Sequence, residues 1–319
     1  ANELSGYIAL IIIEKGDINM KILIIGGSYF LGRVLTMLSS TKFELTLVNR
    51  GRYSMKQFGV KEYFFDRHDI DEWKKLPKEE YDAVVDLCAY QVGDIKKVIQ
   101  GYKGIIRHYI FISTVDVYEH QVGEKYKDES YCLENRHFQG EIGEYIYQKV
   151  QLERELRDIE KVYHIPYTSI RPGNIYGPFN YAPRESEFIK YIVQGLPLII
   201  PSDATATFQL VYVEDVARAI ILVIENKVYN KVYNVVSPQC VHYQDIYACL
   251  KKCHQKVQMI EQPIQKILEI GYALPYPLTL EEMELYNGEA ICKELGLEYT
   301  SLEDGIKKTY QAFLPVFKK

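Results

Sequence analysis

The sequence predicts an α/β fold, with one doubly wound, mostly parallel sheet and a smaller C-terminal α/β lobe. Two observations carry this prediction. From Lys21 onward, short apolar runs alternate with amphipathic stretches, and buried strands separated by helices are typical of a parallel sheet covered on both faces. In addition, 47% of the 319 residues are apolar, so the chain can build a sizeable core.

The expected strands are short runs dominated by apolar and β-branched residues. In order, they span residues 21–25, 43–48, 62–65, 83–87, 108–113, 166–170 and 232–236. The stretches between several of them have the spacing of amphipathic helices. The clearest of these stretches span residues 33–40, 94–102 and 142–160.

After about residue 172 the alternation gives way to segments rich in Pro and Gly, such as RPGNIYGPFNYAPR and GLPLIIP. We therefore expect two domains. A Rossmann domain would comprise residues 20–172 and about 205–236, and a substrate-binding lobe would comprise about 173–204 and 237–319.

Residues 1–19 precede Met20-Lys21, which looks like a natural start. We expect them to be an upstream extension or an added segment outside the core fold. The alternative is a short extra element packed on the domain. Their apolar run YIALIII is too short to span a bilayer, and no basic region precedes it as in a signal peptide.

The formal net charge is −5, which argues against nucleic acid as the main partner. The six cysteines are scattered without a C-x-x-C pair, as expected in a reducing, cytoplasmic compartment. Cys249 and Cys253 lie one helical turn apart beside His254. We expect helix packing there, and we predict no metal site.

The segment LIIGGSYFLGR, residues 23–33, places glycines between the first expected strand and the first expected helix. In this context a phosphate would be bound by free N–H groups and the helix dipole. Read as G-x-x-G-x-x-G, the segment has Gly26 and Gly32 in place but Tyr29 in the middle. Tyr29 must then point away or lie alongside the ligand. An ordinary strand-to-helix turn is the alternative.

Tyr145 and Lys149 form a Tyr-x-x-x-Lys pattern on an expected helix, and this spacing puts both side chains on one face. A lysine cation beside a phenol would lower the phenol's pKa and make Tyr145 a general acid or base. Upstream, the strand FISTVDVY ends in hydroxyl residues that could bind a substrate oxygen. The alternatives are a chance pattern and simple capping of the strand end.

Together these motifs resemble the extended short-chain dehydrogenase/reductase superfamily, in its NAD(P)-dependent epimerase/dehydratase family, from about Met20 to the C-terminus. The segments GGSYFLG, LVNRG, FDRHD and YDAVVDLCAY resemble its atypical branch, which includes chloroplast stem-loop-binding-like proteins. RPGNIYGP and LGLEYTSLEDGIKKTY also resemble signatures of the extended family.

The resemblance implies a role for each matching position. The pyrophosphate turn would comprise Gly26, Gly27, Tyr29, Phe30, Leu31 and Gly32. Other cofactor contacts would be Asp66 to the adenine amine, Cys88 and Ala89 after the fourth strand, Lys149 at the nicotinamide ribose, and Pro172 and Gly173 near the nicotinamide. The catalytic residues would be Thr114, Tyr145 and Lys149, and the substrate would meet Thr114, Asp116, Asn174, Arg184 and the turn from Tyr176 to Pro178.

The end of the second strand bears on the choice of cofactor. Members that prefer NAD usually have an acidic residue there, but this chain has Asn49 followed by Arg50. A guanidinium pairs well with a 2′-phosphate, and Arg52 could assist. We therefore predict NADP rather than NAD. The alternative is that Arg50 is a surface residue.

Two departures from the family pattern limit the substrate. The Thr-Asp-Glu of the dehydratases reads Thr114-Val115-Asp116 here, so the dehydrating acid is missing. The arginine that holds a nucleotide diphosphate in sugar epimerases is replaced by Phe208. Arg184 or Arg171 could substitute for it, although we expect Arg171 to support the fold.

We therefore expect an oxidoreductase or epimerase that acts on a small-molecule secondary alcohol, for which a nucleotide sugar is one candidate. The alternative is a non-catalytic NAD(P)-binding redox sensor or RNA-associated scaffold. The helical segments 94–102 and 143–157 are candidates for a homodimer interface, because relatives often dimerise through two helices of each subunit.

Overall fold

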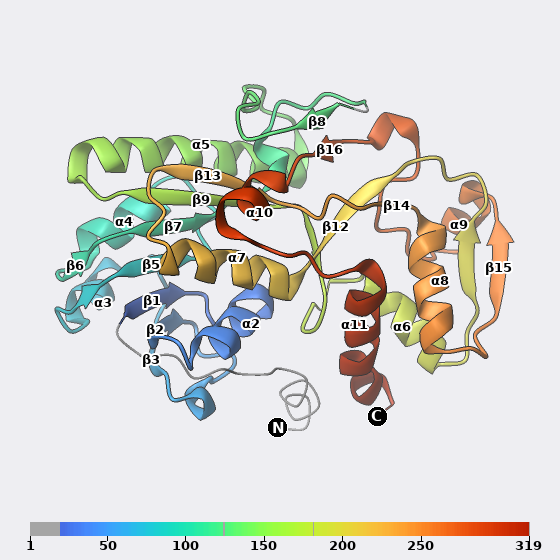
Figure 1. Ribbon diagram of the computed structural model, residues 1–319, viewed down its shortest axis with the longest axis horizontal. Helices are drawn as coiled ribbons and strands as arrows, with labels where there is room; N and C mark the ends of the chain where they lie inside the picture. The colour runs from blue at the N-terminus through green and yellow to red at the C-terminus, as the bar shows by residue number, and fades with distance from the viewer. Residues whose placement is uncertain (1–19, 124, 181, 319) are drawn as a thin grey trace.

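The computed structural model describes residues 20–123, 125–180 and 182–318. The expectations for residues 1–19 lie outside this range. Seven strands form the main sheet, in the order β13-β9-β7-β5-β1-β2-β3 (Figure 1). They are β1 (Lys21–Ile25), β2 (Glu44–Asn49), β3 (Lys61–Phe64), β5 (Ala83–Asp86), β7 (Tyr109–Ile112), β9 (Tyr167–Pro172) and β13 (Lys231–Val235).

Every neighbouring pair in this sheet is parallel, and each strand coincides with one of the expected apolar runs. The chain builds β2 and β3 on one side of β1, then crosses to build β5, β7, β9 and β13 on the other. The predicted doubly wound α/β fold is therefore confirmed. The point where the order reverses lies between β1 and β5, where such folds bind ligands.

The alternation of side chains along β1 divides the core into two layers. Ile22 and Ile24 face one buried cluster, and Leu23 and Ile25 face the other, because successive side chains of a strand point to opposite faces. The first face is covered by α2 (Phe30–Ser39), α7 (Val213–Glu225) and α10 (Glu289–Leu295). The second is covered by α3 (Ile70–Lys75), α4 (Asp94–Gly101) and α5 (Gly140–Tyr163).

The remaining strands form small sheets. They are β10 (Asn174–Tyr176) with β12 (Phe208–Tyr212) and β14 (Cys240–Val241); β11 (Leu198–Pro201) with β15 (Met259–Gln262); β8 (Tyr126–Lys127) with β16 (Leu285–Tyr286); and β4 (Glu80–Tyr81) with β6 (Ile105–Ile106). Several of these are only two residues long, too short to produce a periodic pattern in the sequence.

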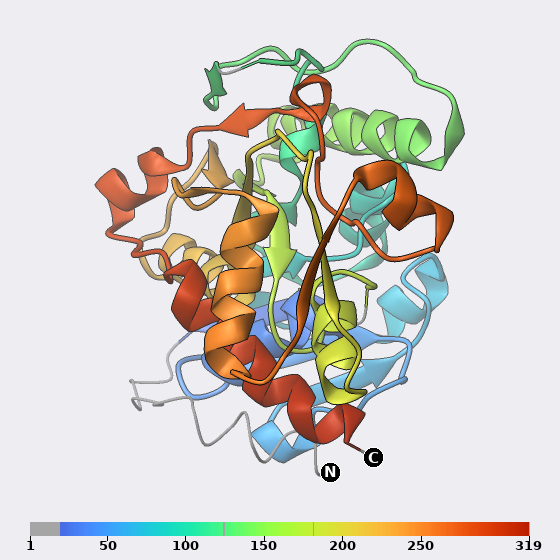
Figure 2. The same ribbon diagram turned by 90° about the vertical axis from the view of Figure 1, so that its right-hand side faces the viewer.

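Four further helices gather at the right of Figure 1, with α11 packed against α8 and α6 (Figures 1 and 2). They are α6 (Glu185–Val193), α8 (Tyr243–Cys253), α9 (Ile264–Glu269) and α11 (Leu302–Phe317). The described ranges also contain three short 3₁₀ helices: η1 (Lys56–Phe58), η2 (Val115–Val117) and η3 (Leu280–Glu282). The division into two domains remains a prediction.

The candidate half-site for a metal lies at the end of α8. Cys249 is buried in the core, and the His254 ring lies 3.1 Å from the Tyr310 hydroxyl. Within the described ranges, no cluster of three or more His, Cys, Asp or Glu side chains is arranged to hold a metal ion. The same part of the chain contains no helix with the length and apolar character needed to cross a bilayer.

Candidate active site

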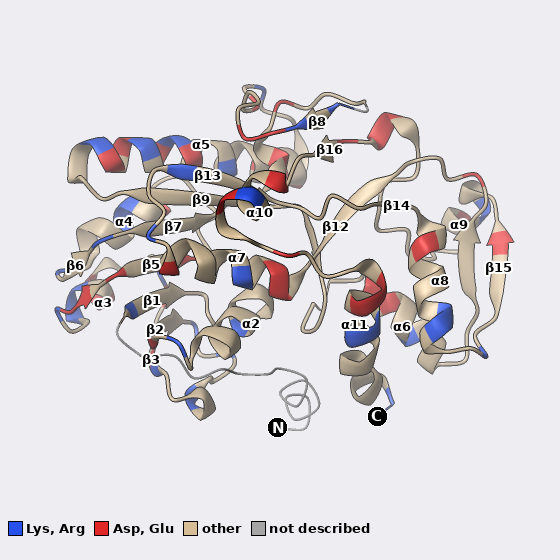
Figure 3. Ribbon diagram, in the orientation of Figure 1, with Lys and Arg blue, Asp and Glu red and all other residues tan. Residues whose placement is uncertain are grey.

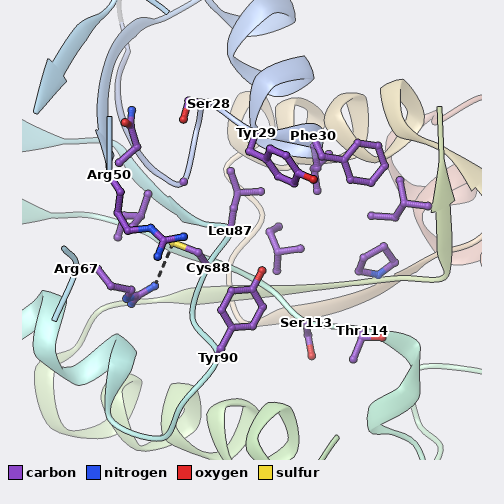
Figure 4. A pocket seen from close by; sticks show the side chains of 18 of the residues that line it. Ser28, Tyr29, Phe30, Arg50, Arg67, Leu87, Cys88, Tyr90, Ser113 and Thr114 are labelled. Atoms are coloured by element: carbon purple, nitrogen blue, oxygen red, sulfur yellow. Dashed lines mark hydrogen bonds between the residues drawn. The ribbon is translucent and has the colours of Figure 1, made fainter. Parts of the chain in front are cut away.

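A cavity of about 790 Å³ lies where β1, β2, β5, β7 and β9 end, beside the reversal of strand order. Figure 4 shows Arg50 and Arg67 on one side of it and Ser113 and Thr114 on another. The structure brings most of the predicted site residues to its wall. They are Gly26, Tyr29, Phe30, Leu31, Gly32, Asn49, Arg50, Asp66, Cys88, Thr114, Asp116, Tyr145, Lys149, Pro172, Gly173, Asn174 and Arg184.

Gly27 and Ala89, also predicted to touch the cofactor, lie behind the wall. The Gly27 carbonyl accepts a hydrogen bond of 2.7 Å from the Thr36 hydroxyl, which ties the turn to α2. Ala89 is fully buried, and its carbonyl accepts a hydrogen bond from Lys149. Both residues therefore support the wall from behind.

The turn between β1 and α2 needs glycine at its two ends. Gly26 has a φ of 90°, a conformation that side chains rarely adopt. A Cβ atom on Gly32 would lie 2.1 Å from the Gly26 carbonyl oxygen, closer than any real contact. These glycines let the first turn of α2 approach β1.

The middle position does not need glycine. Tyr29 has an extended backbone with a φ of −132°, and its half-exposed ring stacks on Tyr53 with the ring centroids 6.5 Å apart. The strain falls instead on Phe30, whose φ is 38°. No side chain caps the first turn of α2, and its first three residues line the cavity. This arrangement suits an anion such as a pyrophosphate.

Asn49 and Arg50 line the cavity where β2 ends. The Asn49 side-chain carbonyl accepts a hydrogen bond of 2.7 Å from the Gly51 N–H, whereas its buried amide nitrogen has no partner among the described residues. Arg50 is exposed and extends into the cavity (Figure 4). Asp66 accepts a hydrogen bond of 2.9 Å from the His68 N–H, which lowers the pKa of its carboxyl group.

Arg67, next to Asp66, is a cavity residue that the motifs did not single out. Its guanidinium donates hydrogen bonds of 2.6 and 2.8 Å to the two carboxylate oxygens of Asp86. Asp86 is fully buried at the end of β5 and also accepts a bond of 2.6 Å from the Tyr109 hydroxyl. The signal was present in the sequence, because an aspartate inside the apolar run AVVDL must find a partner when that strand is buried.

Lys149 projects from α5 into the cavity wall. Its ammonium donates hydrogen bonds of 2.9 Å to the carbonyls of Ala89 and Ile112. Burial lowers its pKa to about 8. The lysine is thus held at a fixed place between the loop that follows β5 and the last residue of β7.

Tyr145 lies one helical turn before Lys149 and also lines the cavity. The expectation that Lys149 lowers its pKa is wrong for the protein alone. The pKa of Tyr145 is raised, first by removal of the phenol from water and then by the negative charge of Asp116. The Lys149 nitrogen lies 5.8 Å from the centroid of the Tyr145 ring and is bound by backbone carbonyls.

Thr114 lies between Tyr145 and Asp116. Its hydroxyl donates a hydrogen bond of 2.8 Å to the Asp116 carboxylate and accepts one of 3.2 Å from the Asp116 N–H. The same hydroxyl lies beside the phenol of Tyr145. Thr114 therefore caps η2, which was the alternative considered for this strand end, and it also lines the cavity.

Asn174 and Arg184 lie at the substrate side of the wall. The turn from Tyr176 to Pro178 does not line the cavity, which corrects the expectation for it. Tyr176 is only 2% exposed, and its ring packs against Tyr212 with the ring centroids 5.5 Å apart. Its hydroxyl occupies the space that a Cβ on Gly305 would need.

Phe208, which replaces the family's anchoring arginine, and Arg171, one of the two candidate substitutes, are both in the core. Phe208 is buried and stacks on Tyr276 with the ring centroids 4.8 Å apart. Arg171 forms a buried ion pair of 2.8 Å with Glu153, and it donates a hydrogen bond of 2.9 Å to the Tyr118 hydroxyl. Arg171 therefore stabilises the fold, as expected.

A doubly wound sheet has a glycine turn at its switch point, and Thr, Tyr and Lys lie on the wall of one cavity, which is the arrangement expected from the resemblance to the short-chain dehydrogenases/reductases. Comparison with known proteins agrees. Residues 98–236 match the NAD dependent epimerase/dehydratase family. The chain is 28% identical over 250 residues to the chloroplast stem-loop binding protein of 41 kDa b from Arabidopsis thaliana. This similarity covers 72% of the chain and 62% of that relative, which is less than two thirds of its length.

Solved structures show the same fold. UDP-N-acetylglucosamine 4-epimerase from Methanobrevibacter ruminantium M1 superimposes with a TM-score of 0.76 at 18% identity, covering 94% of this chain and 99% of that one. UDP-glucose 4-epimerase from Thermotoga maritima does so with a TM-score of 0.73 at 21% identity, covering 93% and 99%.

The family model matches less than half of the chain, and it describes NAD dependent epimerases and dehydratases. These similarities agree with the expected resemblance to that family and with the expectation of a nicotinamide cofactor. The residues present fit such a group, because Gly26 and Gly32 leave room at the start of α2 and the wall offers polar groups along its length.

Proposed function

We propose that the protein is an NAD(P)-dependent oxidoreductase or epimerase that acts on a secondary alcohol of a sugar or a related compound. The observation that carries the proposal is the presence of Tyr145, Thr114 and Lys149 on the wall of the cavity that begins at the glycine turn. None of these three residues is diverted to a role elsewhere in the core.

The first turn of α2 would hold the pyrophosphate, Asn49 and Arg50 the adenosine ribose, and Lys149 the nicotinamide ribose. A nicotinamide cofactor, when bound, supplies the acceptor or donor of a hydride. Tyr145 would remove the hydroxyl proton of the alcohol as the hydride leaves the same carbon, so that the alcohol becomes a ketone. In the reverse direction Tyr145 would return the proton to the ketone oxygen.

We infer a preference for NADP from the end of β2. Arg50 is exposed on the cavity wall, and within the described residues the nearby acid is Asp66, whose pKa Arg50 helps to lower. A guanidinium in this position would attract a 2′-phosphate. The neutral amide of Asn49 would not repel it.

The cavity wall around Arg184 favours a substrate that carries an anionic group. Arg184 lines the cavity half-buried, and its positive charge reaches Asp116 and Glu185. Because Phe208 and Arg171 are committed to the core, Arg184 is the candidate for binding a phosphate or carboxylate. A nucleotide sugar is one such substrate, as in the epimerases that share this fold.

The experiment is hydride exchange in the full-length protein with reduced and oxidised cofactor, followed by nicotinamide absorbance. UDP-glucose and simple secondary alcohols would serve as the first probes. Tyr145→Phe keeps the ring but removes the ionisable oxygen, so turnover should fall by roughly 10² or more while cofactor affinity stays nearly unchanged. Full activity of Tyr145→Phe would contradict the catalytic role.

The similarity to a stem-loop binding protein supports a second candidate, a non-catalytic NAD(P)-binding scaffold. Figure 3 shows positively and negatively charged residues interspersed along the α5 ribbon, and the net charge is −5. This arrangement does not favour RNA. Cofactor binding without hydride exchange on any probe, together with salt-sensitive binding of a stem-loop RNA, would favour the scaffold.

A further inference from the structure

The Thr114 hydroxyl has a fixed hydrogen-bonding inventory. A threonine hydroxyl carries one proton and two acceptor lone pairs. Here the proton lies on the bond of 2.8 Å to the Asp116 carboxylate, and one lone pair accepts the Asp116 N–H at 3.2 Å. One lone pair is therefore left for the cavity. In this arrangement Thr114 can accept a hydrogen bond from an alcohol or a phenol, but it cannot donate one to a ketone or a phenolate.

We propose that Asp116 is a positioning residue that sets the direction of the Thr114 hydrogen bond, and thereby the readiness of Tyr145 to lose its proton. An ionised Asp116 takes the Thr114 proton. A protonated Asp116 no longer requires it, so Thr114 can turn its proton toward the Tyr145 oxygen or toward a substrate carbonyl. The catalytic meaning of this switch rests on the proposed function, whereas the effect on Tyr145 does not.

The surroundings of Asp116 suit a carboxyl group that changes state. Asp116 lies on the cavity wall at η2, where the residue is exposed, and its carboxylate accepts the hydrogen bond of 2.8 Å from the Thr114 hydroxyl. Three charged side chains face it: Glu284 raises its pKa, whereas Lys127 and Arg184 lower it. Lys127 and Glu284 are already paired with each other at 2.7 Å. The surrounding protein atoms of the cavity wall have the largest effect, and they raise the pKa of Asp116.

Asp116 acts on Tyr145 in two ways that have the same sign. Its negative charge raises the pKa of the phenol. Because the Asp116 carboxylate accepts the hydrogen bond from Thr114, the Thr114 hydroxyl cannot donate a bond that would stabilise the phenolate. Neutralising Asp116 should therefore favour Tyr145 as a base. It should also give a ketone the donor that the ionised form withholds.

The test is the titration of a ring-fluorinated tyrosine placed at position 145 of the full-length protein, followed by fluorine NMR. Asp116→Asn is nearly isosteric and neutral, and it should lower the pKa of residue 145 by about one unit or more. Asp116→Ser, also neutral, serves if the asparagine variant does not fold. A pKa that stays where it is in the parent protein would overturn the proposal.

A double-mutant cycle separates the hydrogen bond from the bare charge. Thr114→Val keeps the shape but removes the hydroxyl, so in this background Asp116→Asn should shift the pKa by less than half as much. An equal shift with and without Thr114 would overturn the role of the hydroxyl. Glu284→Gln is the control, since it removes a carboxylate that does not contact Thr114 and should produce the smaller shift.

The titration requires neither substrate nor turnover, so its outcome is independent of the proposed reaction. If the titration succeeds but Tyr145→Phe leaves hydride exchange intact, the proposed function fails and the Asp116 relationship stands. If Tyr145→Phe abolishes exchange but Asp116→Asn leaves the titration unchanged, the positioning role fails alone.

Discussion

The guanidinium of Arg67 and the carboxylate of Asp86 form a two-pronged ion pair, with hydrogen bonds of 2.6 and 2.8 Å, at the base of the cavity. Arg67 also donates a bond of 2.9 Å to the carbonyl of Asp94, where α4 begins. The pair therefore connects β5, the segment after β3 and α4. It holds the backbone that carries Cys88 at the cavity wall, because the Cys88 N–H donates to Asp86 at 3.1 Å.

The first prediction is that this pair is costly to break. Asp86→Asn or Arg67→Ala leaves a buried charge without its partner, and we expect either to lower the free energy of unfolding by about 3–5 kcal/mol. Urea unfolding of each variant measures this loss. The exposed pair between Lys74 and Asp71 provides the control, since Lys74→Ala should change stability little. A loss of unfolding free energy in Lys74→Ala as large as that in Asp86→Asn or Arg67→Ala would contradict the prediction.

The pair should also make stability depend on pH. Full burial acts to raise the pKa of Asp86. The charge and hydrogen bonds of Arg67 outweigh this effect, so the pKa is lowered overall. The folded state thus binds this proton less readily than the unfolded chain. The contribution is fully present above about pH 4, the ordinary pKa of aspartate, and is lost as the pH falls further. The difference in stability between the parent protein and Asp86→Asn should therefore shrink in acid.

The arrangement of the main sheet could be predicted because each of its strands is buried on both faces and forms a continuous apolar run. The glycine turn, Thr114, Tyr145 and Lys149 followed from local spacing. The ion pair between Arg67 and Asp86 could not be predicted from sequence spacing, because the order of the strands in the sheet brings the two residues together. The stacking of Tyr29 on Tyr53 and the strained φ of Phe30 likewise depend on the three-dimensional arrangement around the start of α2.

The raised pKa of Tyr145 shows a second limit. Helical spacing correctly put Lys149 on the same side as Tyr145, but spacing does not reveal which groups bind the ammonium. The carbonyls of Ala89 and Ile112 do so; Ala89 lies in the loop after β5, and Ile112 is the last residue of β7. The effect of Asp116 on the phenol also required the three-dimensional arrangement.

The second prediction concerns the glycine turn. In Gly32→Ala the new methyl group would collide with the Gly26 carbonyl oxygen at 2.1 Å, so α2 must move away from β1. We expect stability to fall by about 1–3 kcal/mol and NADPH affinity to fall at least roughly tenfold, about 1.4 kcal/mol. NADPH fluorescence and thermal unfolding measure the two effects. Gly59→Ala is the control, because it has nothing within 4 Å and does not line the cavity; it should leave NADPH affinity unchanged.

The third prediction concerns cofactor choice. The parent protein should bind NADPH more tightly than NADH, and Arg50→Ala should erase the preference by weakening NADPH alone. Lys56→Ala removes an exposed positive charge that does not line the cavity, so it controls for general attraction of the phosphate. Fluorescence titration of both cofactors decides the matter. Tighter binding of NADH by roughly tenfold in the parent protein, about 1.4 kcal/mol in the opposite direction, would show that Arg50 does not select the cofactor.

The last prediction concerns the buried ammonium of Lys149. Its pKa is lowered to about 8 by burial, whereas a lysine in an unfolded chain has a pKa of about 10.4. Between these values the unfolded chain binds more protons than the folded protein, so this group makes stability rise with pH from about 8 to about 10.4. At neutral pH the buried cation costs about 3 kcal/mol by the same difference, which is the reason to expect a functional role for it.

Lys149→Met keeps the stem of the side chain but removes the cation. We expect this variant to lose the rise in stability at alkaline pH and to bind NADPH more weakly. Its stability at neutral pH should be maintained, because removal of the buried charge offsets the loss of hydrogen bonds to the carbonyls of Ala89 and Ile112. Urea midpoints between pH 7 and 10 and NADPH titrations measure these effects. Lys96→Met changes an exposed lysine on α4 and should keep both the rise and the affinity. If stability still rises between about pH 8 and 10 in Lys149→Met, another group causes the rise, and Lys149 is not a buried ammonium that destabilises the folded protein.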